Sequence, residues 1–137
     1  DVERFADRAM DTLSGGERQR AQFARSLAQL DAPPSEAPAP RYLLLDEPTS
    51  SLDLSHQHAL LTAVRRLAAE GPGVCVVLHD LNLAARYCDR VLLLRRGRVH
   101  AMGTPLEAMT PSTLGPVYDV RFAALRAGSS TVLAVVG

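Results

Sequence analysis

The chain has 137 residues, of which 47% are apolar and 22% are charged, and its formal net charge is zero. This composition excludes a disordered chain and gives no broad attraction to nucleic acid or to anionic lipid. No apolar run is long enough to span a bilayer, and no segment resembles a secretory signal. Cys75 and Cys88 have no Cys-x-x-Cys spacing, so we expect them to be packing residues in a reducing compartment such as the cytosol.

The first predicted element is a helix at residues 14–30. Ser14 is a suitable N-cap, and Glu17 follows three positions later, as a capping box requires. Apolar residues then recur at helical spacing. The next ten residues, 31–40, include four prolines and therefore predict a surface loop.

A strand, a helix and a second strand are predicted next. Residues 42–45 form a continuous apolar run, typical of a buried parallel strand, and residues 74–78 form another. Between them, residues 54–69 have a helical apolar pattern that Gly71 and Gly73 terminate. This order predicts a βαβ unit with two parallel strands.

The last third of the chain predicts short helices and two hairpins. Helices are expected at residues 81–87, 105–109 and 111–118. One hairpin is expected at residues 91–95 and 99–102, around Gly97, and another at residues 121–126 and 131–136, around Gly128 and Ser129.

All 15 basic residues are arginine, and this excludes one common phosphate-binding motif. A P-loop of the form G-x-x-x-x-G-K-[ST] needs a lysine to reach the β- and γ-phosphates. The sequence printed here therefore contains no standard P-loop.

Polar residues follow both predicted parallel strands, where open α/β sheets bind ligands. Asp46 and Glu47 end the first strand, and His79 ends the second. The carboxylates are either a solvated strand end or a pair with divided labour, one holding Mg²⁺ and the other polarising a water. His79 is either a structural histidine or a phosphate contact.

Two further segments also have both a structural and a functional interpretation. Gly15 and Gly16 follow Ser14 in the sequence. They either belong to a capped helix start or let an anion approach the positive end of the helix. Asp53 ends a turn at residues 49–53 and is either an ordinary helix cap or part of a site.

Taken in order, these segments closely resemble the ATP-binding-cassette (ABC) ATPase family. Residues 13–17 resemble its signature motif, residues 43–47 its Walker B strand, residues 50–53 its D-loop and His79 its switch histidine. The resemblance covers essentially the whole chain, but the Walker A loop and the glutamine loop of that family have no counterpart here.

The resemblance implies a role for each matching residue. Asp46 would organise Mg²⁺ and Glu47 would be the general base, while His79 would contact the γ-phosphate of ATP. Asp53 would lie at a dimer interface. The ATP of a partner subunit would be contacted by the signature residues, which are Ser14, Gly15, Gly16 and Glu17.

The implied fold is α/β, a partial P-loop NTPase-like ABC core with a mostly parallel sheet and the remnant of a helical subdomain. Residues 1–30 would end that subdomain, residues 41–102 would hold the Walker B, D-loop and switch elements, and residues 103–137 would form C-terminal helices and a hairpin. The complete protein would be a homodimeric ATPase at the cytoplasmic face of the bacterial inner membrane. It would bind two permease subunits, serve a periplasmic binding protein indirectly, and bind no nucleic acid.

Within the family, residues 52–58, residues 78–85 and the Pro/Ala-rich stretch before Arg41 are most similar to importers of haem, iron-siderophore complexes or vitamin B12, and to haem importers above all. Two alternatives stay open: a non-transport ABC ATPase of DNA repair or chromosome structure, and an inactive truncated copy. Without Walker A, we expect the chain alone to be inactive as an ATPase and to expose open sheet edges.

Overall fold

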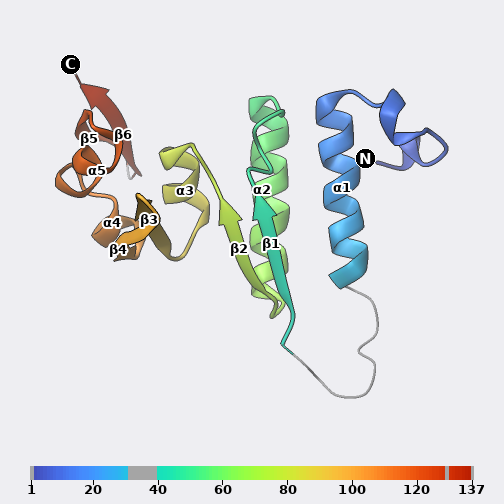
Figure 1. Ribbon diagram of the computed structural model, residues 1–137, viewed down its shortest axis with the longest axis horizontal. Coiled ribbons are helices and arrows are strands. Elements are labelled where there is room, and N and C mark those ends of the chain that lie inside the picture. Colours follow the sequence, from blue (N-terminus) through green and yellow to red (C-terminus); the bar gives the residue numbers. More distant parts are fainter. Residues whose placement is uncertain (1, 31–39, 129, 137) are drawn as a thin grey trace. The chain divides into compact units, whose positions relative to one another are not determined.

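The computed structural model describes residues 2–30, 40–128 and 130–136, so residues 31–39 of the predicted loop lie outside the described part. The chain divides into two compact units, Asp1–Leu78 and His79–Gly137. Figure 1 shows the elements of each unit along the chain.

The first unit begins with two 3-10 helices, η1 (Glu3–Phe5) and η2 (Met10–Thr12), and continues with helix α1 (Gly15–Leu30). The predicted capping box is present at the start of α1. The Glu17 N–H donates to Ser14 Oγ at 3.3 Å, and the Ser14 N–H donates to the Glu17 carboxylate at 2.9 Å. These reciprocal bonds satisfy two backbone donors and fix where α1 begins.

The predicted βαβ unit is confirmed. It consists of β1 (Tyr42–Asp46), α2 (Leu54–Ala69) and β2 (Gly73–Val77), with the two strands parallel (Figure 1). Asp53 caps α2, because its side chain accepts the His56 N–H at 2.9 Å. The prediction and the structure agree on both ends of α2.

The prediction that both strands are buried is wrong for one face of the pair. In β1, Leu43 and Leu45 are buried, whereas Tyr42 and Leu44 are 67% and 77% exposed. Side chains alternate between the two faces of a strand, so an apolar run reveals its length but not how many of its faces are covered.

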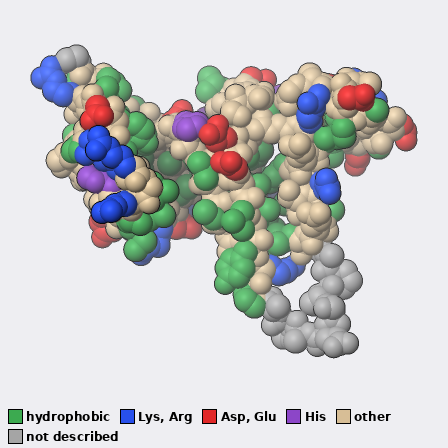
Figure 2. All heavy atoms as spheres, viewed as in Figure 1, with side chains coloured by type: hydrophobic (Ala, Val, Ile, Leu, Met, Phe, Trp, Pro, Cys, Tyr) green, Lys and Arg blue, Asp and Glu red, His purple; other side chains and the backbone are tan. Residues whose placement is uncertain are grey.

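The uncovered face extends onto β2. There Val77 is 48% exposed and Cys75 is also exposed, so the packing role expected for Cys75 is wrong. The covered face has the buried side chains of α2 beside it, Leu60, Leu61 and Val64. Figure 2 shows hydrophobic side chains gathered at the surface over β1 and β2. In the described residues, this sheet is therefore covered on one side.

The second unit has the short helices and the two hairpins that the sequence predicts. Its elements are α3 (Leu81–Tyr87), β3 (Val91–Arg95), β4 (Arg98–Gly103), α4 (Pro105–Ala108), α5 (Pro111–Tyr118), β5 (Arg121–Ala127) and β6 (Ser130–Val136). The pairs β3–β4 and β5–β6 are antiparallel. Arg96 (φ 50°) and Gly97 (φ 72°) form the turn between β3 and β4, and two successive positive φ angles are typical of the tight hairpin turn that matches strand twist.

Across residues 2–30, 40–128 and 130–136, every helix is too short or too polar to cross a membrane.

Candidate functional site

The N-terminal end of α1 is built from the predicted signature residues. Ser14 and Gly15 are exposed there, and Glu17 is engaged in the capping box. The hydrogen bond from the Ser14 N–H, then that from its hydroxyl, and then the nearby Arg8 hold the pKa of the Glu17 carboxyl below its ordinary value. In this structure Glu17 therefore anchors the helix start.

Gly16 has a second, structural reason to be glycine. A Cβ built at this position would lie 3.0 Å from the Ser51 carbonyl oxygen, closer than real Cβ contacts usually are. Gly15 has more room, since its Cβ would lie 3.8 Å from Ser51 Cβ. The sequence left both glycines open between a capped helix start and anion approach. It did not reveal that Gly16 lets α1 approach the backbone of the loop that follows β1.

That loop, residues 47–53, begins with an unusual backbone conformation at Glu47. Glu47 has φ 45°, in the left-handed region that a residue with a side chain rarely adopts. Its N–H donates to the Val77 carbonyl at 3.2 Å, which continues the parallel pairing of the two strands. Asp46, the last residue of β1, is exposed. Non-glycine residues in this region concentrate at functional sites.

The 47–53 loop is held by hydrogen bonds to its own backbone. The Ser50 N–H and hydroxyl donate to the Glu47 carbonyl at 3.2 and 3.1 Å. From α2, Gln57 Nε2 donates to the carbonyls of Thr49 and Leu52 at 3.2 and 3.0 Å. Because both ends of the loop are bonded in this way, its shape is well defined.

Gln19 joins α1 to this loop. Its Nε2 donates to the Glu47 carbonyl at 2.9 Å, and its Oε1 accepts the Ser51 N–H at 3.3 Å. These bonds bring the predicted signature helix and the predicted acidic strand end together within the first unit. Sequence reasoning missed both Gln19 and Gln57, because a glutamine on a helix is ordinarily a surface residue.

Asp53 acts as a helix cap in the structure. Besides the His56 N–H, its carboxylate accepts the Ser55 hydroxyl at 2.8 Å and lies 2.8 Å from His56 Nδ1. The hydrogen bond from the His56 backbone, followed by those from the His56 and Ser55 side chains, holds the pKa of Asp53 well below its ordinary value. The cap interpretation is confirmed, and a role at a dimer interface stays a prediction.

His79 is exposed and is the first residue of the second unit. Asp80, beside it, caps α3 by accepting the N–H groups of Asn82 and Leu83 at 2.8 and 3.0 Å. His79 is thus placed between the end of β2 and a capped helix. Its contact with a phosphate stays a prediction.

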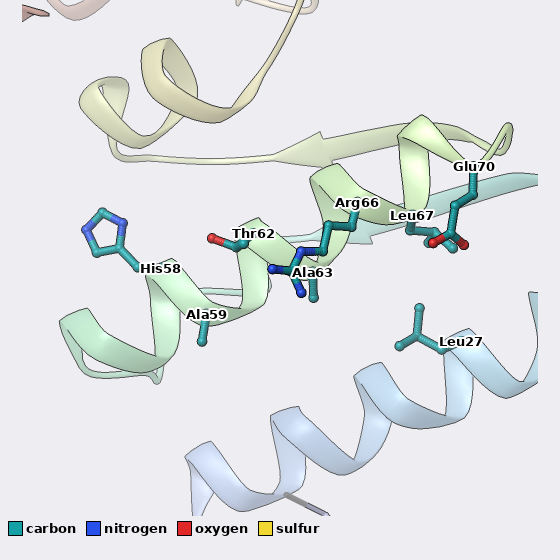
Figure 3. A pocket seen from close by; sticks show the side chains of 8 residues that line it. All are labelled: Leu27, His58, Ala59, Thr62, Ala63, Arg66, Leu67 and Glu70. Atoms are coloured by element: carbon teal, nitrogen blue, oxygen red, sulfur yellow. The ribbon is translucent and has the colours of Figure 1, made fainter.

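A separate hollow of about 580 Å³ lies between α1 and α2, and Figure 3 shows its lining. Leu27 lines it from α1, whereas the other side chains belong to α2 and its C-cap: His58, Ala59, Thr62, Ala63, Arg66, Leu67 and Glu70. None of these residues is a predicted site residue. The hollow is therefore distinct from the candidate site.

The candidate site suits a metal ion that takes most of its ligands from elsewhere. Within the described ranges, no three His, Cys, Asp or Glu side chains are grouped so that they could hold a metal. Mg²⁺ often binds through one or two carboxylates and completes its shell with waters and substrate phosphates. The exposed Asp46 carboxylate at the end of β1 fits that mode of binding.

No family model matches the chain. Among curated proteins, it is 52% identical over 126 residues to the hemin import ATP-binding protein HmuV of Plesiomonas shigelloides, covering 85% of this chain and 48% of the relative. It is 61% identical over 108 residues to HmuV of Pseudomonas putida, covering 79% of this chain and 41% of the relative. The chain thus spans about half the length of the curated relatives it matches.

The solved structures agree with these relatives. A metal-chelate type ABC transporter in an inward-facing conformation superposes with a TM-score of 0.79 and 27% identity, over 98% of this chain and 52% of that one. The ABC transporter cassette MJ0796 superposes with a TM-score of 0.64 and 34% identity, over 75% of this chain and 40% of that one. The chain therefore has the fold of part of an ABC ATPase domain. Within this class, its sequence is similar to the hemin import ATP-binding proteins.

Proposed function

We propose that this chain is part of the ATP-hydrolysing subunit of an ABC importer that powers haem uptake. The observation that carries the proposal is its 48–61% identity to hemin import ATP-binding proteins over most of its length. The similar solved structures include transporter cassettes, which favours transport over DNA repair. The chain spans about half the length of these relatives and contains no standard P-loop, so the proposed activity is that of a complete ATPase.

The chemistry is assigned to the acidic end of β1. Asp46 would supply one carboxylate oxygen to Mg²⁺, and the metal would neutralise charge on the ATP phosphates. Glu47 would accept the proton of the attacking water. Its placement directly after the strand, with its backbone bonded to Val77 and Gln19, supports a fixed general base.

The remaining site residues are assigned to a two-subunit assembly. The tip of α1, with Ser14 and Gly15 exposed at the positive end of a 16-residue helix, fits a terminal phosphate held by a partner subunit. Asp53 would lie at the interface between the two subunits, and His79 would stabilise charge on the γ-phosphate. The assembly would bind two permease subunits at the cytoplasmic face of the inner membrane.

Glu47→Gln in the complete ATPase tests the assigned chemistry. An amide cannot accept the proton of the attacking water, so the turnover number should fall by a factor of about 100 or more while ATP still binds. Steady-state hydrolysis and nucleotide binding would be measured on the same preparation. Glu70→Gln, at an exposed position after α2, is the matched control. Equal turnover in the two variants would remove Glu47 from the mechanism.

Deletion of the gene tests the cargo. Cells that lack the protein should fail to grow with haem as the sole iron source and should recover when the gene is restored. Undiminished growth on haem, with lost growth on an iron-siderophore complex or lost use of vitamin B12, would reassign the cargo within the same importer subgroup.

A further inference from the structure

The geometry points to Gln19 as a positioning residue for Glu47. Its side-chain amide spans from α1 to the 47–53 loop, donating to the Glu47 carbonyl at 2.9 Å and accepting from the Ser51 N–H at 3.3 Å. Both of these bonds reach backbone atoms, so Gln19 acts on the backbone that carries Glu47. This inference rests on the proposed function, since it concerns the residue assigned as general base.

The backbone at Glu47 needs support of this kind. With φ 45°, Glu47 occupies a region that side chains disfavour, and such a conformation persists only when its surroundings hold it. Two side chains bond its carbonyl, Gln19 from α1 and Ser50 from within the loop. The Cα and the carbonyl group of Glu47 belong to one planar peptide unit. Fixing the direction of the carbonyl therefore also limits where the Glu47 side chain can point.

Gln19 differs from the other residues that hold the loop. Ser50 and Gln57 lie close to their partners in sequence, whereas Gln19 is 28 residues from Glu47 and belongs to another helix. It also lies one turn of α1 beyond Gly15 and Gly16, at the end assigned to a partner's phosphate. Gly16 lies against the Ser51 carbonyl, so α1 has no room for a side chain there and Gln19 supplies the polar connection.

Two substitutions separate the two hydrogen bonds. Gln19→Glu keeps the length of the side chain and an acceptor for the Ser51 N–H, but it replaces the donor to the Glu47 carbonyl with an oxygen. Gln19→Met keeps the approximate size and removes both bonds. Gln22→Glu is the matched control, because Gln22 is an exposed glutamine on the same helix.

In the complete ATPase, both Gln19 variants should lower kcat by about tenfold. A general base acts only in the transition state, so misdirecting it slows the chemical step without weakening ATP binding. KM for ATP and ATP-driven dimerisation should match those of Gln22→Glu. A purely structural role would give another pattern: Gln19→Glu would be milder than Gln19→Met, and KM would rise as kcat falls.

The proposal is overturned by that pattern, or by a kcat for Gln19→Glu within about twofold of the control. Glu47→Gln measured alongside keeps the two hypotheses apart. If Glu47→Gln is inactive and Gln19→Glu is fully active, the positioning role of Gln19 fails and the general base stands. If Glu47→Gln retains full activity, the assignment of the base fails and the role of Gln19 fails with it.

Discussion

The side chain of Asn82 pairs with the backbone of Leu133 as a neighbouring strand would. Its Nδ2 donates to the Leu133 carbonyl at 3.2 Å, and its Oδ1 accepts the Leu133 N–H at 2.8 Å. The two residues are 51 positions apart, so the pair fastens β6 to α3 within the second unit. The sequence places Asn82 in a predicted helix at residues 81–87 and gives no sign of this partner 51 positions away.

Asn82→Ala should therefore destabilise the second unit. Removing the amide leaves a partly buried N–H and carbonyl of Leu133 without these partners, which costs about 1–3 kcal/mol. Urea unfolding of this chain would measure the change. Asn82→Asp retains an acceptor but has no donor for the Leu133 carbonyl. Its stability should therefore lie between those of the native chain and Asn82→Ala. An unchanged midpoint for Asn82→Ala would show that pairing with β5 holds β6 in place without this pair.

Adjacent glycines at the start of α1 should respond differently to the same substitution. Gly16→Ala places a methyl group 3.0 Å from the Ser51 carbonyl oxygen, whereas Gly15→Ala places one at 3.8 Å from Ser51 Cβ. Both gain helix propensity, so their difference isolates the close contact. We expect Gly16→Ala to be less stable than Gly15→Ala by about 1 kcal/mol or more in denaturant unfolding. Equal stabilities would mean that the loop moves aside at little cost.

The cap of α2 should make stability depend on pH in the acid range. Hydrogen bonds to the ionised carboxylate lower the pKa of Asp53 in the folded state, so its contribution is complete above the pKa of the unfolded chain and is lost as pH falls toward the folded value. Asp53→Asn keeps a capping oxygen without a charge. The advantage of the native chain over Asp53→Asn should therefore shrink below about pH 4.

Thermal unfolding of both proteins from pH 7 to pH 2 would test this dependence. Ser55→Ala removes one of the hydrogen bonds that lower the pKa of Asp53 in the folded state. In that variant the contribution of the Asp53 charge should be smaller, and its loss should be complete at a higher pH. A constant difference between the native chain and Asp53→Asn across the whole range would contradict the explanation.

Neighbouring leucines of β1 should differ sharply when each is replaced by alanine. Leu43 is 5% exposed and Leu44 is 77% exposed. Leu43→Ala should cost about 2–5 kcal/mol, as buried leucines do, and Leu44→Ala should change stability by less than about 0.5 kcal/mol. Chemical denaturation of the two variants would measure both values. A large loss in Leu44→Ala would mean that another surface covers this face in solution, for example in a self-associated chain.

The order and type of the elements could be predicted from the sequence because local signals agree along the chain. The helix at α2, for instance, has an aspartate cap before it, an apolar stripe within it and glycines after it. Burial was harder to predict. Residues 42–45 are apolar throughout, and nothing in a four-residue run distinguishes a strand covered on both faces from one covered on a single face.

The candidate site could be predicted from the sequence only through its motif residues. Motif residues such as Asp46 and Glu47 could be selected because their residue types suit phosphate chemistry at a strand end. The supporting residues Gln19 and Gln57 could not be selected in this way, because they bond to backbone atoms of the 47–53 loop. For Gln19 that loop is also distant in sequence. Every residue has a backbone carbonyl, so the residue type of the partner does not reveal such a bond in the sequence.

Under the proposed assignment of Glu47 as general base, its left-handed backbone sets protein stability against catalytic activity at a single position. Glycine or asparagine would occupy that conformation more comfortably, yet neither could remove a proton from water. A screen that selects only for heat resistance should therefore drift away from glutamate here, and its survivors would be well-folded proteins that no longer turn over.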